Sequence, residues 1–353
     1  MALLKTKGLI VGVVGATGMV GRELLSLLER RRFPVAELLP FSSGLRRTKV
    51  RFKGRLLAVH SADRSSLERC DAIFFVSSDA VSASLAPGLA RRGIWCLDDS
   101  SAFRPAPDVP LVIPEINASS LSPDRRLVAG PNCTVTGLAV AGYPLHRLAG
   151  VRRVRLASYQ AVSGAGKAAL DEFLVQARAL ASSLKLGDGP APIPVNKKAR
   201  FLPAPIACNV IPQVGAFDSF GRSSEESKIS SELNKLWGAD VSVSATTVRV
   251  PVVRGHSLAV WLEFERPLSP SRARRLLAKA PGVSLFDSGY PTPLQAGGKD
   301  GVFVGRLRQG VDSRELCLWI VSDNLLKGAA LNSIQTAEEL LRRGWLSPRG
   351  FSV

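Results

Sequence analysis

The chain has 353 residues, enough for two domains with buried cores, and 46% of them are hydrophobic, which excludes a largely disordered protein. It carries 47 lysines and arginines against 29 aspartates and glutamates, a formal net charge of +18. The positive charges are spread along the chain as arginine pairs, and only 6% of residues are aromatic. The sequence therefore lacks the clustered basic and aromatic patch typical of a nucleic-acid-binding protein.

The apolar runs and the cysteines argue against three further classes. No uninterrupted apolar run reaches the roughly 18 residues that a membrane-spanning helix needs. The N-terminal stretch lacks a small-residue cleavage site and leads into a glycine loop, so we interpret it as a strand and expect a cytoplasmic protein. The five cysteines stand singly and there are three histidines, a pattern that predicts neither a disulfide framework nor a metal site.

Strands and helices are expected to alternate in the first 132 residues. Apolar runs predict strands at 8–14, 36–41, 56–60, 72–76 and 94–97, and helical spacing predicts helices at 19–31 and 80–92. This alternation is typical of an α/β fold with a doubly wound parallel sheet of the Rossmann type.

The pattern changes after residue 132. Strands are expected at 154–161, 241–250, 257–264 and 316–321, helices at 135–148, 167–184 and 325–343, and a long loop at 187–205. This mixture indicates a second, α+β domain built on a mixed sheet.

A glycine-rich turn, GATGMVG at 15–21, follows the first expected strand and opens the first helix. Glycines permit a tight turn and let backbone N–H groups at a helix N-terminus approach a pyrophosphate. The alternative is a tight turn without a ligand. We predict a dinucleotide cofactor bound by Gly15, Thr17, Gly18, Met19 and Val20.

The residues after the second expected strand bear on the choice between NAD and NADP. An acidic residue there would bind the ribose hydroxyls. Instead the sequence has Ser42 and Ser43, followed by Arg46 and Arg47. Hydroxyls and guanidinium groups suit a 2′-phosphate, so the pattern favours NADP.

A second motif, GPNCTVT at 130–136, places Cys133 at the start of an expected helix. The partial positive charge of a helix N-terminus lowers the pKa of a thiol and favours the thiolate. Cys70, Cys96 and Cys317 instead fit the pattern of small buried hydrophobic residues. Cys133 is therefore the candidate nucleophile.

A third motif, RVPVVRGHS at 249–257, combines Arg249 on a strand with His256 after a glycine turn. An arginine can bind a carboxylate through two parallel hydrogen bonds, and a histidine with a pKa near neutral can transfer protons to and from sulfur. A lone histidine is more often structural. With a candidate nucleophile elsewhere in the chain, a catalytic role is favoured.

These motifs together resemble the aspartate-semialdehyde dehydrogenase family over nearly the full chain. The matching stretches are GATGMVG (15–21), PNCT (131–134), SYQAVSGAGK (158–167), EESK (225–228), RVPVVRGHS (249–257) and SDNLLKGAALNSIQTAEEL (322–340). The resemblance implies NADPH-dependent reduction of L-aspartyl 4-phosphate to L-aspartate 4-semialdehyde and phosphate, in the biosynthesis of lysine and diaminopimelate, threonine and methionine. It also implies a homodimer or a tetramer.

The resemblance further implies a division of the chain and roles for matching positions. Residues 1–132 with the C-terminal helix at 324–353 would bind NADP, and 133–323 would form the catalytic and dimerisation domain. Cys133 would form an acyl-thioester, with His256 as acid and base. Gln160 would orient the acyl group, and Asn132 would fix the cysteine. Arg249 would bind the substrate carboxylate and Glu225 its amino group, while Lys228 and Arg104 would bind the phosphate. The cofactor would also be bound by Ser163, Gly164 and Asn324.

One position departs from the family pattern. The family usually has an arginine after the second strand where this sequence has Gly44, which leaves Arg46 and Arg47 as the substitutes and the strictness of NADP preference open.

Four alternatives remain beside this interpretation. N-acetyl-γ-glutamyl-phosphate reductase shares the fold and the chemistry but differs around its cysteine and histidine. Malonyl-CoA reductases are not separated by motif. A non-catalytic relative is expected to lose the nucleophile, whereas Cys133, Gln160, Arg249 and His256 are all present. A nucleic-acid-binding paralogue would bind with a steep dependence on salt.

Overall fold

The computed structural model of the protein describes residues 8–42, 48–183 and 199–349. Its internal contacts separate two compact units. The first unit holds the described residues of Met1–Asn132, Lys235–Trp237 and Leu326–Val353, and the second holds those of Cys133–Asn234 and Gly238–Leu325.

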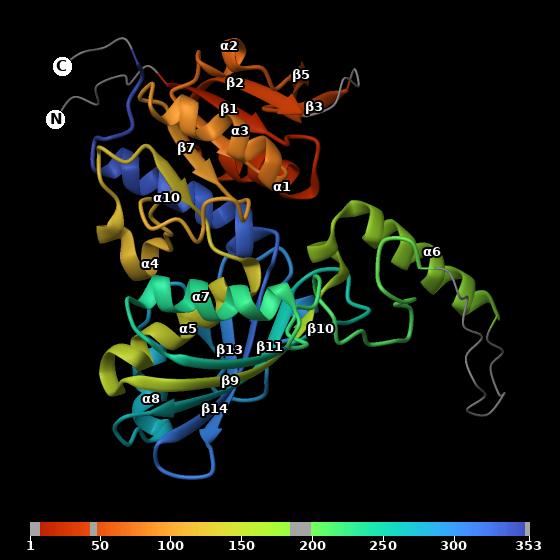
Figure 1. The fold of residues 1–353 in the computed structure, drawn as a ribbon, viewed down its shortest axis with the longest axis vertical. Helices are drawn as coiled ribbons and strands as arrows, with labels where there is room; N and C mark the ends of the chain where they lie inside the picture. Colours follow the sequence, from red (N-terminus) through yellow and green to blue (C-terminus); the bar gives the residue numbers. More distant parts are fainter. Residues whose placement is uncertain (1–7, 43–47, 184–198, 350–353) are drawn as a thin grey trace. The chain divides into compact units, whose positions relative to one another are not determined.

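A six-stranded sheet forms the centre of the first unit (Figure 1). Its strand order is β5-β2-β1-β6-β7-β8, and every neighbouring pair is parallel. The strands are β1 (Leu9–Val14), β2 (Val35–Ser42), β5 (His60–Ser61), β6 (Ala72–Phe75), β7 (Trp95–Asp98) and β8 (Leu127–Ala129). The predicted parallel sheet of the Rossmann type is confirmed.

Apolar cores lie on both faces of this sheet because side chains alternate along each strand. On β6, Phe74 joins a core with helices α1 and α10, whereas Ile73 and Phe75 join a second core with helix α3. The sheet is therefore doubly wound, as predicted. The helices of this unit are α1 (Met19–Arg30), α2 (Arg64–Leu67), α3 (Asp79–Ala90), α4 (Pro114–Asn117), the 3-10 turn η1 (Ala118–Ser120), the π-helix η3 (Leu326–Ala330) and α10 (Leu331–Arg342).

Two expectations for this unit were partly wrong. The run at 56–60 is not one strand of the parallel sheet. Its first residues belong to β4 (Arg55–Ala58), which forms a separate antiparallel hairpin with β3 (Lys49–Phe52), and only His60 enters the parallel sheet, as the first residue of β5. Lys53 and Gly54 join β3 and β4 with φ angles of 45° and 76°, the paired positive values that a two-residue type I′ turn requires. The C-terminal segment is also not one continuous α-helix, because its first turn is η3.

The second unit is built on a mixed six-stranded sheet of order β10-β9-β11-β14-β13-β12. Its end pairs, β10 with β9 and β12 with β13, are parallel, and the pairs between them are antiparallel. The strands are β9 (Val151–Gln160), β10 (Ser242–Arg249), β11 (His256–Phe264), β12 (Val283–Leu285), β13 (Val302–Gln309) and β14 (Glu315–Ser322). The predicted α+β fold with a mixed sheet is confirmed.

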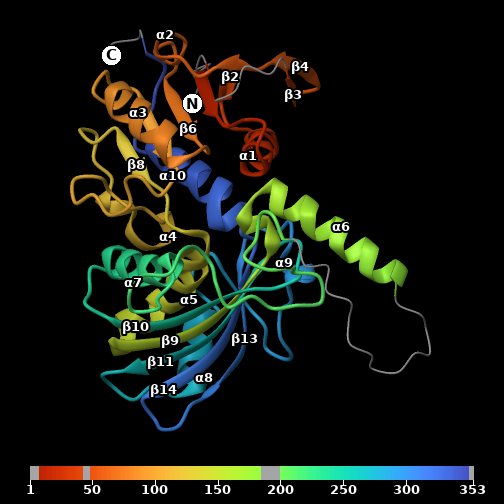
Figure 2. The ribbon, with the colours of Figure 1, turned by 45° about the vertical axis from the view of Figure 1, so that its right-hand side comes forward.

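Helices α5 and α8 cover one face of this sheet (Figure 2). The helices of the unit are α5 (Cys133–Ala149), the 3-10 turn η2 (Val162–Ala165), α6 (Lys167–Ser183), α7 (Ser224–Trp237, in this unit as far as Asn234), α8 (Pro270–Leu277) and α9 (Pro293–Ala296). Of the loop expected at 187–205, residues 199–205 are irregular and the rest lies outside the described residues.

Candidate active site

Cys133 is the first residue of α5, two residues earlier than the sequence predicted. Its side chain is partly exposed, and its Sγ lies 3.3 Å from Nε2 of His256. Unpaired N–H groups at the start of a helix stabilise negative charge, so this position favours a thiolate. The structure thus brings together the two residues that separate motifs nominated.

His256 is the first residue of β11 and is only 2% exposed. Its Nδ1 accepts a hydrogen bond of 3.1 Å from the N–H of Ala161, so the neutral ring carries its proton on Nε2, facing the sulfur. Burial, together with the positive charge of Arg249, lowers the pKa of His256 to about 3. The expectation of a pKa near neutral was wrong, because the site is too deeply buried for an imidazolium.

Arg249 ends β10 and stands beside Gln160, its register partner at the end of the parallel strand β9. The residue is 5% exposed, and its Nη1 donates to the carbonyl of Ala161 at 2.8 Å. Nε has no hydrogen-bond partner, and burial lowers the pKa of the group, whereas the charges of Cys133 and Glu225 raise it. A buried guanidinium with an unused donor fits an anionic ligand such as a carboxylate.

Glu225 lies in the first turn of α7, which a reciprocal capping box between Ser223 and Glu226 starts. Its Oε1 accepts hydrogen bonds from Thr134 Oγ1 at 3.2 Å and from Gln160 Nε2 at 3.3 Å. These donors hold the carboxylate in one orientation. Sequence reasoning missed Thr134, although its place directly after the cysteine in the PNCT motif was a usable signal.

Gly164, predicted to bind the cofactor, also lies against the side chains of Arg249 and His256. A Cβ at this position would come within 2.9 Å of Arg249 Nη1 and 3.2 Å of His256 Nε2. Ser163 and Asn324 are hydrogen-bonded to each other, with Asn324 Nδ2 donating to Ser163 Oγ at 3.0 Å. Asn324 Oδ1 also accepts the N–H of Gly255, so the pair is tied to the turn that precedes His256.

The glycine turn lies in the first unit, between β1 and α1. Gly15 has a φ of +95°, and a Cβ there would come within 2.4 Å of the Val76 carbonyl. Gly18 caps α1, whose first residues are Met19 and Val20. Only a small residue leaves backbone N–H groups accessible to a ligand in such a turn, so the local geometry fits a pyrophosphate.

The remaining predicted residues are distributed over both units. Ser42 ends β2, whereas Ser43 lies outside the described residues. Arg104 donates from Nε to the Gly130 carbonyl at 2.9 Å and from Nη2 to the Asp99 carbonyl at 2.7 Å.

Two further predicted residues lie close in the chain to the candidate site residues Cys133 and Glu225. Asn132 is buried and directly precedes Cys133. Lys228 lies one turn after Glu225 on α7, a spacing that places both side chains on the same side of the helix.

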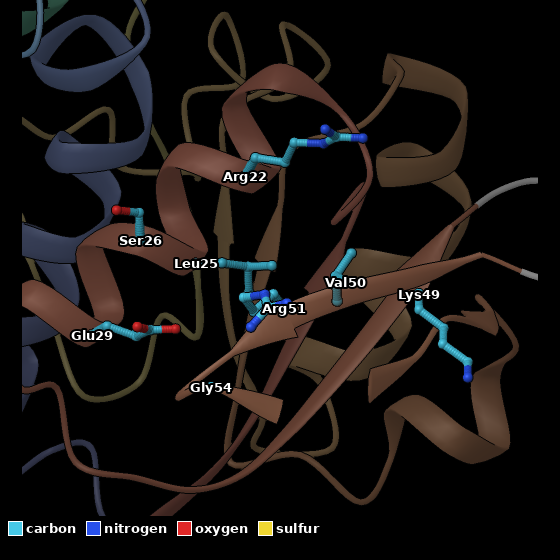
Figure 3. A pocket seen from close by; sticks show the side chains of 8 residues that line it. All are labelled: Arg22, Leu25, Ser26, Glu29, Lys49, Val50, Arg51 and Gly54. Carbon is cyan, nitrogen blue, oxygen red and sulfur yellow. The ribbon is translucent and has the colours of Figure 1, made fainter. Parts of the chain in front are cut away.

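A surface pocket of about 380 Å³ lies in the first unit beside α1 (Figure 3). Residues of α1 between Arg22 and Glu29 line one side, and residues of the hairpin between Lys49 and Gly54 line the other. Figure 3 shows the charged ends of Arg22 and Lys49 pointing in different directions. None of the predicted cofactor residues that the structure describes lines this pocket.

Within the described ranges, no group of three or more histidine, cysteine, aspartate or glutamate side chains could hold a metal ion. Over the same ranges, every helix is too short or too polar to cross a membrane.

Comparisons with known proteins agree over most of the chain. The family model "Semialdehyde dehydrogenase, NAD binding domain" matches residues 10–123, and "Semialdehyde dehydrogenase, dimerisation domain" matches residues 143–327. The chain is 40% identical to aspartate-semialdehyde dehydrogenases of Synechocystis and of Bacillus subtilis, with 95% of this chain and 98% of each relative covered.

Solved structures agree with this result. The crystal structure of aspartate semialdehyde dehydrogenase II from Vibrio cholerae matches with a TM-score of 0.89 at 35% identity, covering 95% of this chain and 99% of that one. The resemblance seen in the sequence motifs is confirmed, and the chain belongs to the aspartate-semialdehyde dehydrogenase family.

Proposed function

We propose that this protein reduces L-aspartyl 4-phosphate to L-aspartate 4-semialdehyde and phosphate with NADPH, and that it catalyses the reverse reaction. The observation that carries the proposal is the 3.3 Å contact between Cys133 Sγ and His256 Nε2, beside a buried arginine and a buried glutamate. Family membership supports the reaction class, and the site chemistry supports the roles given below.

Two charged side chains fit the two ends of the amino-acid part of the substrate. Arg249, with its unused Nε donor, binds the α-carboxylate. Glu225, held by Thr134 and Gln160, accepts hydrogen bonds from the ammonium group. Following the family pattern, Lys228 and Arg104 hold the phosphate and neutralise its charge as it leaves.

Chemistry begins at Cys133. Its thiolate attacks the acyl carbon, the bond to phosphate breaks, and an acyl-thioester forms. Gln160 orients the acyl group, and Asn132 fixes the cysteine. NADPH, when bound, supplies the hydride that reduces the thioester to the aldehyde.

His256 acts on the sulfur as a hydrogen-bond donor. Because Ala161 occupies Nδ1, the neutral ring presents its Nε2–H to Cys133. It stabilises the thiolate before attack and again when the carbon–sulfur bond breaks. With the pKa at about 3, this neutral donor is the form of the free enzyme at pH 7. A substrate carboxylate bound to Arg249 would offset the positive charge that lowers this pKa, which would let His256 act as acid and base.

The cofactor assignment rests on the first unit. Residues Gly15, Thr17, Gly18, Met19 and Val20 would bind the pyrophosphate, and Ser42 with Ser43 would bind near the adenosine ribose. Ser163, Gly164 and Asn324 would complete the nicotinamide end. Accordingly, we propose 1–132 with 324–353 as the NADP-binding domain and 133–323 as the catalytic and dimerisation domain.

The face of the mixed sheet opposite α5 and α8 suits a homodimer. Trp261 is 36% exposed and Tyr159 is 39% exposed, and the Tyr159 ring packs against Trp319 with centroids 5.6 Å apart. Large aromatic side chains of this kind are enriched at interfaces between subunits. We propose that this face joins two copies of the chain, and that the protein is located in the cytoplasm. A tetramer would need a second contact surface.

The decisive experiment measures NADP reduction by the purified protein with L-aspartate 4-semialdehyde, with and without phosphate. We expect turnover that requires phosphate, and Cys133→Ala should abolish it while leaving NADPH binding intact. N-acetyl-glutamate semialdehyde, and malonate semialdehyde with coenzyme A, test the two related reductases. Turnover that is faster with either of these, or that persists in Cys133→Ala, would overturn the proposal.

A further inference from the structure

The ammonium group of Lys235 is fully engaged by backbone carbonyls. Its Nζ donates to the carbonyls of Arg104 at 2.8 Å, Ala106 at 2.6 Å and Val109 at 2.9 Å. An ammonium group has three protons, so all three are used in these bonds. Lys235 belongs to the first unit, as do the residues that it contacts.

The three carbonyls lie in one irregular segment between β7 and α4. Residues 101–109 form turns and no regular helix or strand, so their carbonyls lack the partners that a helix or a sheet provides. Hydrogen bonds to a charged donor are stronger than those between neutral groups. Lys235 therefore fixes the shape of this segment around Arg104.

Arg104 is anchored a second time, through its side chain. Its guanidinium donates to the carbonyls of Gly130 and Asp99, at 2.9 Å and 2.7 Å. Lys235 holds the backbone of Arg104 and these two carbonyls hold the guanidinium. An arginine that is fixed both at its backbone and at its guanidinium is preorganised to bind an anion, because little conformational freedom is lost on binding.

We infer that Lys235 is a positioning residue for the phosphate subsite, acting through Arg104. The inference rests on the proposed function, in which Arg104 holds the phosphate. Lys235 itself does not reach the ligand, because its three donors are committed to the segment. Loss of its ammonium group should weaken phosphate binding and leave recognition of the amino-acid part unchanged.

The test uses the phosphate-dependent oxidation of aspartate semialdehyde by the full-length protein. Lys235→Met keeps the aliphatic stem and removes the donors, and we expect the KM for phosphate to rise on the order of tenfold. The KM values for aspartate semialdehyde and NADP should stay within about twofold of wild type. Lys279→Met, an exposed lysine on the second unit, is the matched control and should change none of these constants.

A double mutant separates positioning from a general structural effect. In an Arg104→Ala background, Lys235→Met should add no further rise in the KM for phosphate, because the group that it positions is gone. Amide hydrogen exchange at 101–109 should be faster in Lys235→Met than in wild type, with exchange in α1 unchanged. If Lys235→Met does not fold, Lys235→Gln, which retains two amide donors, replaces it throughout.

The outcomes distinguish this inference from the proposed function. Wild-type protein without phosphate-dependent turnover would overturn both. Normal wild-type turnover, with an unchanged phosphate KM in Lys235→Met or an equal rise in the Arg104→Ala background, would overturn the positioning role alone.

Discussion

At the scale of single residues, the proposed catalytic pair, Cys133 and His256, owes its properties to its neighbours. The Ala161 N–H sets the tautomer of His256, and the adjacent Arg249 charge adds to burial in keeping the ring neutral. Burial lowers the pKa of Arg249, and its attraction to negative charge on Cys133 opposes that shift, so the guanidinium also stabilises the thiolate. The site therefore favours a thiolate beside a neutral histidine over a thiolate–imidazolium pair.

The low pKa of His256 predicts a pH dependence of stability. In the folded protein His256 stays neutral down to pH of about 3, whereas in the unfolded chain it takes up a proton as pH falls through about 6.5. Its contribution is therefore present at pH 7 and is lost as pH falls between these values, by up to about 1.4 kcal/mol per pH unit. In denaturant unfolding, the free energy of unfolding should fall more steeply with decreasing pH in wild type than in His256→Asn. Parallel curves for the two proteins between pH 6.5 and 4 would contradict the neutral histidine.

Gly164 predicts a second effect at this scale. Gly164→Ala would place a methyl group against Arg249 Nη1 and His256 Nε2, and both side chains are too buried to move away freely. We expect kcat/KM for aspartate semialdehyde to fall by about 10²-fold or more, because small displacements of catalytic groups are costly. Gly88→Ala is the control, since its methyl group would meet only the flexible end of Arg64. Equal activity of both variants would remove Gly164 from the site.

Much of the candidate site could be predicted from the sequence, because its reactive groups stand in short motifs. Cys133, Arg249 and His256 were found in this way, and the structure places them together. The contacts that tune them could not be predicted. Ala161 reaches His256 because β9 pairs with β11, and no local pattern encodes that register. The pKa of His256 depends on this burial and was therefore missed.

At the scale of elements, local sequence signals predicted where helices and strands lie better than they predicted how the strands pair. The first strand and helix follow apolar periodicity and were predicted within a residue or two. Helix α7 was missed because it is polar, although the Ser223–Glu226 capping box was readable in the sequence. The hairpin of β3 and β4 was missed because its Lys53-Gly54 turn carries only one glycine.

The π-helix η3 provides a prediction at the element scale. It buries Lys327, whose Nζ contacts Glu115 at 2.7 Å, Gln335 at 2.6 Å and Asn332 at 3.3 Å. Lys327→Met leaves the Glu115 carboxylate without its cation and should destabilise folding by about 3–5 kcal/mol, measured by denaturant unfolding. Adding Glu115→Gln should recover part of this loss. A Lys327→Met variant as stable as wild type would show that the ion pair contributes nothing to holding η3 against α4.

At the scale of the whole molecule, the association of two chains was predicted from the family resemblance alone. The motifs all describe ligand chemistry, and no motif marks the face of the mixed sheet opposite α5 and α8. That face becomes visible once the strands are paired. Trp261 and Tyr159 alternate with core residues along β11 and β9, and neighbouring strands bring their outward side chains onto one surface.

The exposed tryptophan predicts how association can be broken. Trp261→Glu removes a large aromatic side chain from this face and places a charge there, which a partner subunit would have to desolvate. We expect sedimentation velocity to show a dimer for wild type and a monomer for Trp261→Glu. Leu294→Glu, at a side chain that is 95% exposed, is the control and should remain dimeric. Because the Cys133–His256 pair lies within one chain, a monomer can keep its fold and its site. Circular dichroism therefore separates a folded monomer from an unfolded variant, which loses its signal. A folded Trp261→Glu dimer would place the subunit interface on another surface.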